Sequence, residues 1–104
     1  MQIVSAIHEC HNRNIIHRDL KLENVLFSSR CRKKIKIVDF GIAGVFAKGG
    51  ISDKNEAFTL RYAAPELILS DDSRSHPSLD VWTIGIMLYA MLFNLMPFNG
   101  TTKE

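Results

Sequence analysis

With 104 residues, of which 46% are hydrophobic and 23% charged, the chain is long enough for one small globular domain and is too apolar for a disordered protein. Its net charge of +2 at pH 7 is too small to indicate binding to nucleic acid or to a membrane. The two cysteines, Cys10 and Cys31, lack paired spacing, which argues against a disulfide framework and predicts a reducing, intracellular location, in the cytoplasm.

Residues 1–12 are expected to form the end of an amphipathic helix, because Ile3, Val4, Ile7 and Cys10 recur at helical spacing. The polar residues that follow, 12–14, would terminate this helix. Histidines and a cysteine in this region also raise the question of a zinc site. Residues two apart on a helix point in different directions, so His8 and Cys10 do not meet on one ion, and no zinc site is expected.

A polar cluster follows between His17 and Asn24, where the sequence reads HRDLKLEN. It places a carboxylate at Asp19, a cation at Lys21 and a carboxamide at Asn24, with a leucine on either side of the cation. We expect irregular backbone here, leading into a strand. The residue types are those of a site that positions charge rather than of a packed core.

A small hairpin is predicted next. Residues 25–27 form a short apolar strand, residues 28–34 a polar turn, and residues 35–38 an alternating second strand. Asn24 precedes the first strand and Asp39 follows the second, so a rigid hairpin would present both side chains at neighbouring loop ends. The turn is basic, and two interpretations of it stay open. It is an anion-binding or nuclear-import patch, or, as we favour, a solvated turn. The basic residues are Arg30, Arg32, Lys33, Lys34 and Lys36.

Residues 41–58 are rich in Gly, Ser, Asn, Lys and Asp and are expected to form a mobile loop. Pro65 is suited to the first position of a short helix that continues through residues 66–69. Residues 70–78 are polar and typical of a turn.

A long apolar helix is predicted from Leu79 or Asp80 to about Leu95. The run of residues 81–98 carries no charge and reaches the length of a candidate membrane span. Asn94 and Pro97 interrupt the run, and no Lys or Arg lies close to either end. We therefore favour a helix buried on all sides in a larger core.

Three motifs stand in order along the chain: HRDLKLEN at residues 17–24, Asp-Phe-Gly at 39–41 and Ala-Pro-Glu at 64–66. They resemble the catalytic loop, the metal-binding loop and the end of the activation segment of eukaryotic protein kinases. The resemblance implies a mainly α fold with a small β-hairpin, a partial protein-kinase-like fold that contains the C-terminal lobe only. Residues 1–104 would be a partial kinase domain, with the N-terminal lobe and the last helices of the C-terminal lobe outside it.

The resemblance implies a role for each residue of the polar cluster. Asp19 would accept or orient the proton of the substrate hydroxyl, and Lys21 would offset charge on the transferred phosphoryl group and contact the nucleotide. Asn24 and Asp39 would bind Mg²⁺ and, with it, ATP, because both offer the oxygen donors that a hard cation prefers. Glu23 would help to shape the nucleotide or substrate site.

Lys21, placed two residues after Asp19, resembles serine/threonine kinases, as does the stretch that begins at Thr59. In such kinases the equivalent of Thr59 hydrogen-bonds the catalytic Asp and Lys. The expected partner is thus a protein substrate with a Ser or Thr acceptor, with no nucleic acid or membrane. The nearest subgroup is the calcium/calmodulin-dependent and AMP-activated-like kinases. Leu22 occurs in some of these kinases where proline is common.

Arg18 beside the catalytic aspartate implies control by activation-loop phosphorylation, because a cation there favours an anionic partner. Asn55 occupies the position at which the family places its modified residue. Our hypothesis is that Glu56 or Asp53 supplies fixed negative charge in place of a phosphate. Ser52 is an alternative phosphosite.

Further residues are implied as structural supports. His17 and Phe40 resemble members of a hydrophobic column, Asp80 resembles a buried carboxylate that fixes the catalytic-loop backbone, and residues 25–27 would lie beneath adenine. Glu66 is expected to be a buried carboxylate whose arginine partner lies beyond the chain, a cost of about 3–5 kcal/mol.

These 104 residues alone are therefore expected to be neither a competent ATP binder nor a stable monomer. Two alternatives to a kinase fragment follow. One is a non-catalytic kinase-like fragment that acts as a binding or regulatory module, and the other is a single-span membrane protein based on residues 81–98.

Overall fold

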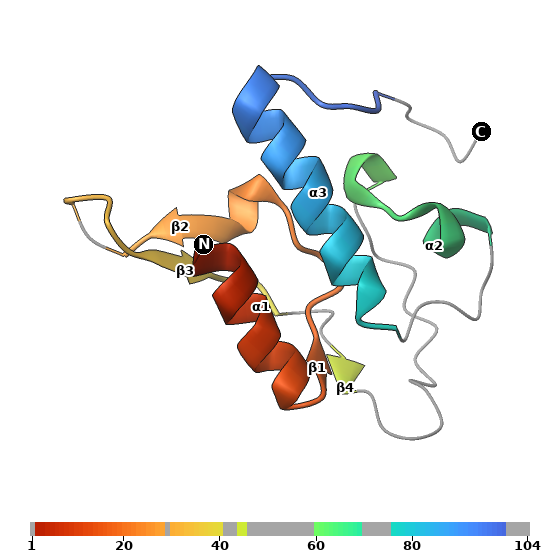
Figure 1. The fold of residues 1–104 in the computed structure, drawn as a ribbon, viewed down its shortest axis with the longest axis horizontal. Helices are drawn as coiled ribbons and strands as arrows, with labels where there is room; N and C mark the ends of the chain where they lie inside the picture. The colour runs from red at the N-terminus through yellow and green to blue at the C-terminus, as the bar shows by residue number, and fades with distance from the viewer. Residues whose placement is uncertain (1, 29, 41–43, 46–59, 70–75, 100–104) are drawn as a thin grey trace.

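The computed structural model describes residues 2–28, 30–40, 44–45, 60–69 and 76–99 (Figure 1). The elements run in the following order: α1 (Gln2–Asn12), β1 (Ile15–Ile16), the 3₁₀ turn η1 (Leu22–Asn24), β2 (Val25–Phe27), β3 (Ile35–Ile37), β4 (Gly44–Val45), the 3₁₀ turn η2 (Leu60–Tyr62), α2 (Pro65–Leu69) and α3 (Ser78–Phe93).

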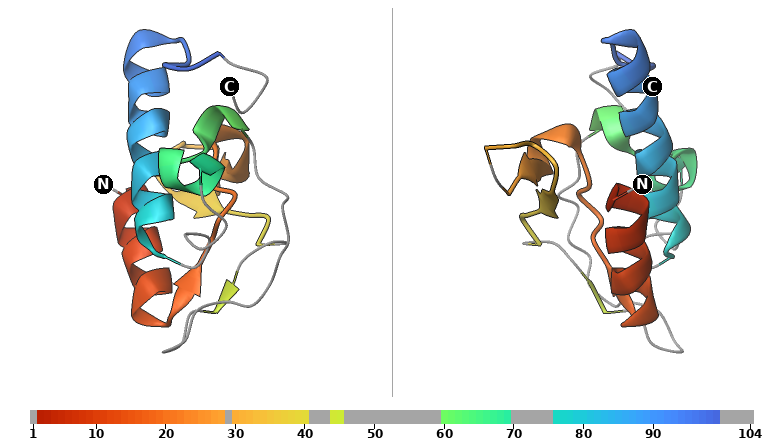
Figure 2. Two further views of the ribbon diagram at one scale, coloured as in Figure 1. Left: turned by 90° about the vertical axis from the view of Figure 1, so that its right-hand side faces the viewer. Right: turned by 60° about the vertical axis from the view of Figure 1, so that its left-hand side comes forward.

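Helices α1 and α3 lie beside each other, and the β2–β3 hairpin projects from them (Figures 1 and 2). A core cluster joins these parts of the chain. It contains Ile7 of α1, Leu20 of the polar loop (residues 17–24), Tyr62 of η2, and Ile86 and Met87 of α3. Because the buried Leu20 belongs to the polar loop itself, the position of that loop depends on the packing of the core.

Helix α1 ends at Asn12, as the polar residues 12–14 predict. Asn14 then adopts a left-handed backbone with φ of 59°, a conformation that asparagine tolerates better than most residues and that commonly ends helices. Ile7 is buried, in agreement with the predicted apolar face, whereas Val4 is exposed.

Strands β2 and β3 pair antiparallel with Val25 opposite Ile37, which confirms the predicted hairpin. The backbone N–H of Val38 also donates to the carbonyl of Asn24 at 2.8 Å. This bond extends the ladder past the end of β3. Asn24 and Asp39, the residue after Val38, therefore lie at the same open end of the hairpin, as the spacing predicts.

The turn between β2 and β3 is exposed, in agreement with the favoured interpretation of a solvated turn. The exposed basic residues here are Arg30, Arg32, Lys33 and Lys34 of the turn and Lys36 of β3. The side-chain amide of Gln2 fixes one side of this turn. Its Nε2 donates to the carbonyl of Lys33 at 2.8 Å, and its Oε1 accepts the N–H of Ile35 at 3.0 Å.

A second two-stranded sheet, β1 with β4, is not predicted by the sequence. Ile15 lies opposite Val45 and Ile16 opposite Gly44 in an antiparallel pair. A strand of two residues shows no periodicity, so its pairing becomes visible only in the tertiary structure. The sheet matters for the site because Ile16 is fully buried directly before His17.

Helix α3 begins at Ser78, one or two residues before the predicted start, and ends at Phe93, slightly short of the predicted end. Asn94 closes it with a left-handed φ of 54° and a backbone bond to the carbonyl of Ala90 at 2.9 Å. In the part of the chain that the structure describes, no helix has the length and apolar character needed to cross a membrane.

Only one side of α3 is buried within these 104 residues, whereas the sequence favours a helix buried on all sides in a larger core. The buried residues are Leu79, Asp80, Thr83, Ile86, Met87 and Ala90. The apolar residues of the helix that are exposed include Val81, Leu88, Met91, Leu92 and Phe93. The physical reason is geometric: the described residues pack against one side of α3 and leave the other side in solvent.

Helix α2 begins at Pro65, as predicted from the fit of proline to the first helical position. The carboxylate of Glu66 is exposed rather than buried, which corrects the expected burial cost. Water hydrates an exposed carboxylate, so the penalty of about 3–5 kcal/mol for a buried charge that lost its partner does not apply.

Candidate functional site

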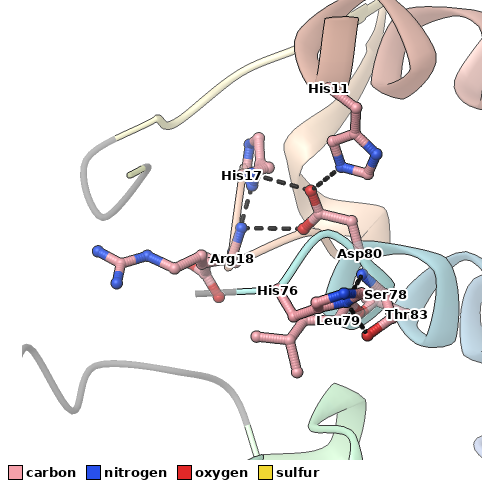
Figure 3. Close-up of polar contacts among 9 residues, drawn as sticks. His11, His17, Arg18, His76, Ser78, Leu79, Asp80 and Thr83 are labelled. Atoms are coloured by element: carbon pink, nitrogen blue, oxygen red, sulfur yellow. Dashed lines mark hydrogen bonds and ion pairs between the residues drawn. The ribbon is translucent and has the colours of Figure 1, made fainter. Parts of the chain in front are cut away.

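The side chain of Asp80 on α3 accepts hydrogen bonds from the backbone of the polar loop (Figure 3). Its Oδ2 accepts the N–H of His17 at 2.9 Å, and its Oδ1 accepts the N–H of Arg18 at 3.0 Å. The Nε2 atom of His11 lies 2.8 Å from Oδ2 as a third partner. Asp80 is only 1% exposed, and a buried carboxylate is tolerated where such donors surround it. The geometry agrees with the expected support of the loop backbone by Asp80.

The start of α3 is also fixed by hydrogen bonds. The N–H of Ser78 donates to Nδ1 of His76 at 3.2 Å, and the N–H of Leu79 donates to the His76 carbonyl at 3.2 Å (Figure 3). Asp80 follows in the first turn, where the helix dipole favours a negative charge. The carboxylate of Asp80 is therefore presented to the loop by a helix end that is itself fixed by hydrogen bonds.

The ring of His17 links the loop to the end of β3. The N–H of Asp19 donates to Nδ1 at 3.3 Å, and Nε2 lies 3.0 Å from the carbonyl of Val38. Because Nδ1 accepts a hydrogen bond, the network assigns the proton to Nε2, which donates to Val38. The ring of Phe40 packs on His17 with centroids 4.5 Å apart. The predicted association of His17 with Phe40 is thus present.

Two residues of the site have left-handed backbones that non-glycine residues seldom adopt. Arg18 has φ of 69° and Asp39 has φ of 61°. Each such residue costs about 1–3 kcal/mol and persists only where its surroundings impose the conformation. For Arg18 the bond from its N–H to Asp80 is one such constraint. Strain of this kind is concentrated at functional sites.

The side-chain oxygens of Asn24 and Asp39 are of the type that a hard divalent cation prefers. Nδ2 of the buried Asn24 donates to the carbonyl of Asp19 at 2.8 Å. This bond fixes the orientation of the amide and leaves Oδ1 as its remaining acceptor. The exposed carboxylate of Asp39 follows β3 at the same end of the hairpin. Two oxygen donors with phosphate and water completing the shell is a typical Mg²⁺ arrangement.

No group of three His, Cys, Asp or Glu side chains in the described ranges converges in a way that would hold a metal ion. Neither Cys10 nor Cys31 forms a disulfide. Burial, and then the charge of Asp80, raise the pKa of the Cys10 thiol above its usual 9.0, so this thiol is protonated at neutral pH.

Lys21 and Asp19 lie together as the sequence predicts. The Nζ of Lys21 is 3.6 Å from Oδ2 of Asp19, and both side chains are partly buried. A partly solvated pair of this kind contributes about 0–1 kcal/mol to stability. Its significance is therefore positional: a cation and a carboxylate sit at one point of the loop.

Glu23 is exposed, and its negative charge adds to burial in raising the pKa of the Tyr62 phenol above its usual 10.0. Thr83 on α3 holds the backbone of Tyr62, since its Oγ1 donates to the Tyr62 carbonyl at 3.3 Å. The sequence did not predict these roles of Tyr62 and Thr83. The available signal was the position of Thr83, three residues after Asp80 on the same helix face.

A small pocket with room for about one water molecule opens beside Asp19. Residues 18–20 of the polar loop, residues 62–64 and α3 line it. Thr59 and the residues invoked for charge substitution, Ser52, Asp53, Asn55 and Glu56, lie outside the described residues, as does most of the predicted loop 41–58.

These features define a protein-kinase-like fold fragment, with helices, small antiparallel sheets and a polar loop fixed by a buried helix carboxylate. Comparison with known proteins agrees, because the model of the protein kinase domain matches residues 1–104. The chain therefore belongs to the protein kinase family, in the serine/threonine group represented by the relatives below.

Three curated relatives illustrate the similarity. The probable serine/threonine-protein kinase MARK-A of Dictyostelium discoideum is 44% identical over 95% of this chain. NUAK family SNF1-like kinase 1 of Homo sapiens is 41% identical over 95%, and the serine/threonine-protein kinase SIK3 homolog of Danio rerio is 41% identical over 99%. The chain spans 9%, 14% and 8% of the lengths of these proteins, respectively.

Proposed function

We propose that the protein containing this chain is a serine/threonine protein kinase, which transfers the γ-phosphoryl group of ATP to a protein hydroxyl. The observation that carries the proposal is the arrangement of the polar loop. Asp19, Lys21 and Asn24 lie in one loop whose backbone is bonded to Asp80, and Asp39 lies at the adjoining end of the hairpin.

Residues 1–104 are proposed to be part of the C-terminal lobe of the kinase domain. The support is the content of the chain: a catalytic-loop motif between α1 and a short hairpin, followed by the Ala-Pro-Glu motif and a long apolar helix. We propose a cytoplasmic location, which is supported by the finding that neither Cys10 nor Cys31 forms a disulfide.

Phosphoryl transfer asks a protein mainly for positioning and charge stabilisation. In this proposal the carboxylate of Asp19 orients the acceptor hydroxyl and receives its proton. The ammonium of Lys21, 3.6 Å from that carboxylate, lies where it can offset negative charge on the transferred group. The bond from Asn24 to the Asp19 carbonyl holds the loop in shape around both.

Asn24 Oδ1 and the Asp39 carboxylate would hold Mg²⁺, which supplies neutralisation of the phosphate charges when bound. The surface around the small pocket beside Asp19 is proposed to contact the protein substrate. A Ser or Thr acceptor is favoured because Lys21 follows Asp19 by two residues and because two relatives carry the serine/threonine designation in their names.

The test is transfer of labelled γ-phosphate from ATP by the whole protein to peptide libraries with Ser, Thr or Tyr acceptors. We expect label on Ser or Thr and a loss of about 10³-fold or more in kcat for Asp19→Asn, because the proton acceptor is removed. Arg13→Ala, which alters an exposed ion pair with Glu9 on α1, is the matched control and should leave the rate unchanged.

Label on tyrosine alone, or equal rates for Asp19→Asn and the unaltered protein, would contradict the proposal. Absence of transfer by a folded whole protein that still binds a protein partner would favour the alternative, a non-catalytic regulatory module.

A further inference from the structure

The charged turn between β2 and β3 has no role in the proposed chemistry. It lies at the outer end of the hairpin, away from the end that carries Asn24 and Asp39 (Figure 1). Five cations fall within seven positions here, and all five side chains are exposed in the structure. They are called the basic turn below, although the last of them belongs to β3: Arg30, Arg32, Lys33, Lys34 and Lys36.

The part of the chain that the structure describes does not neutralise these cations. None of the five forms an ion pair with another described residue, whereas Arg13 lies 2.8 Å from Glu9 and Lys21 lies 3.6 Å from Asp19. Of the 13 Lys and Arg in the chain, five stand in the basic turn, and the other eight are outnumbered by 11 Asp and Glu. Positive charge is therefore concentrated at one place on a chain that is otherwise acidic.

Hydrogen bonds hold the backbone of the basic turn. From α1, Nε2 of Gln2 donates to the carbonyl of Lys33 at 2.8 Å, and Oε1 of Gln2 accepts the N–H of Ile35 at 3.0 Å. Directly after β2, the N–H and the hydroxyl of Ser28 donate to the carbonyl of Lys34 at 2.9 and 3.3 Å. These bonds use the backbone of the turn and leave its charged groups in solvent. The cations are thus presented on a fixed backbone.

The stability of the turn does not explain its composition. Like charges on neighbouring residues repel one another, and salt screens this repulsion only partly below the Debye length of about 8 Å. Arg32 also has a left-handed backbone with φ of 54°, a conformation that favours glycine or asparagine. Both features cost stability. An anionic partner would offset the repulsion between the cations, so the composition is that of a binding surface.

A short acidic segment of a protein is the partner that fits this surface. The basic turn is narrow, because it is the tip of a single hairpin, and the rest of the chain has more acidic than basic residues. A long nucleic acid or a membrane surface would also approach those acidic residues and be repelled by them. A short peptide rich in Asp and Glu contacts the turn alone, and its carboxylates accept charge-assisted hydrogen bonds from Lys and Arg.

We propose that the basic turn is a docking surface for an acidic segment of the protein substrate, separate from the surface that contacts the acceptor residue. The inference rests on the proposed function and names the class of substrate: a protein with a run of Asp and Glu at a distance from its Ser or Thr acceptor. Docking raises the local concentration of the acceptor at the site, so it lowers KM without a new contact to the reacting groups.

The length of the hairpin sets the spacing between acceptor and acidic segment. From Asn24 to Arg30 the chain advances by six residues, which span at most about 20 Å at about 3.3 Å per residue. An extended linker of about six residues has the same reach. A shorter linker cannot place the acceptor at Asp19 while the acidic segment lies on the turn.

The first experiment measures docking without phosphoryl transfer, by the fluorescence anisotropy of a labelled oligoglutamate peptide added to the whole protein. The variant Arg30→Glu, Lys33→Glu and Lys34→Glu reverses three exposed charges and keeps the backbone bonds, so circular dichroism should be unchanged. We expect its Kd for the peptide to rise about tenfold or more, the combined effect of three exposed ion pairs. Raised NaCl should weaken binding by the unaltered protein.

A single reversal supplies the matched control. Lys34→Glu and Arg13→Glu change the net charge of the chain by the same amount, and both positions are exposed. Lys34→Glu should weaken binding of the oligoglutamate peptide, whereas Arg13→Glu, on α1, should leave it unchanged. Equal weakening by both variants would show that only the net charge matters, and it would overturn the docking surface.

The second experiment measures KM for a Ser or Thr acceptor peptide that carries an acidic extension. With a linker of about eight residues the extension should lower KM about tenfold relative to a glutamine extension of the same length, whereas a linker of about two residues should not. The value of kcat should not change. The triple variant should lose this gain and keep the KM of the peptide that has no extension.

Several outcomes overturn the inference. One is equal affinity of the triple variant and the unaltered protein for the oligoglutamate peptide, and another is peptide binding that leaves KM unchanged at every linker length. Binding to phosphatidylserine vesicles or to duplex DNA without binding to the peptide also overturns it and assigns the turn to another class of partner. If the unaltered protein transfers no phosphate, the proposed function fails, and the anisotropy still decides whether the turn binds an acidic segment.

Discussion

The carboxylate of Asp80 accepts the backbone N–H of His17 at 2.9 Å, across 63 positions of the sequence. The same carboxylate accepts the next N–H, from Arg18, whose left-handed backbone turns it toward the helix. One buried side chain thus fixes two consecutive peptide groups directly before Asp19. The contact is the clearest link between the apolar helix and the polar loop.

Asp80→Ala is expected to lower the free energy of unfolding of the whole protein's kinase domain by about 2–6 kcal/mol. Two backbone N–H groups would lose their acceptor, and each unsatisfied buried group costs about 1–3 kcal/mol. Asp80→Asn keeps one carbonyl oxygen and should cost about half as much. Urea denaturation followed by circular dichroism measures both values. Glu9→Gln, in an exposed pair on α1, serves as the control, and equal stability of Asp80→Ala and this control would contradict the prediction.

Lys21→Met should separate activity from stability. The pair with Asp19 is partly solvated at 3.6 Å, so its loss should change the free energy of unfolding by no more than about 1 kcal/mol. We expect kcat to fall by about 10²-fold or more, because the cation that offsets phosphoryl charge is removed. Steady-state kinetics and urea denaturation on the same sample test this. A large loss of stability with a normal rate per folded molecule would show that Lys21 is structural.

The contribution of Tyr62 to stability should depend on pH. Its pKa is raised by folding above the usual 10.0, so the contribution is fully present below pH 10 and is lost as the pH rises through the raised value. Tyr62→Phe removes this titration. The difference in free energy of unfolding between the unaltered protein and this variant should be constant at lower pH and shrink above pH 10. Tyr89→Phe provides the comparison, and a difference that grows above pH 10 would reverse the assigned sign.

Residues 1–104 alone should self-associate in solution, because the uncovered side of α3 is apolar. Leu92 is 68% exposed and Val81 61% exposed on a 16-residue helix, and contiguous apolar surface of this kind promotes association. Analytical ultracentrifugation should show concentration-dependent assembly, reduced by Val81→Lys and Leu92→Lys together. Ser5→Lys, at an exposed position of α1, is the control for an added positive charge away from α3. A folded monomer at every concentration would contradict both this prediction and the expected instability of the isolated chain.

The sequence was sufficient for the local elements. Helix α1 and the β2–β3 hairpin follow from apolar periodicity, and the start of α2 follows from the fit of Pro65 to a first helical position. The motif order identified the family, and the spacing of Asn24 and Asp39 predicted their common end of the hairpin. These features depend on residues close together in the chain. Their structure is determined by the backbone conformations that each residue favours and by the spacing of apolar side chains.

The contacts that join distant residues were decided by the tertiary structure. Thr83 and Tyr62 have no motif of their own, and their roles follow from the packing of η2 on α3. The same packing covers one side of α3, while Glu66 stays in solvent, against expectation. The sequence alone determined which chemical groups the loop carries and which family they indicate. Only the tertiary structure decided how the loop is held, because burial and hydrogen bonding between remote segments depend on the packing of the whole core.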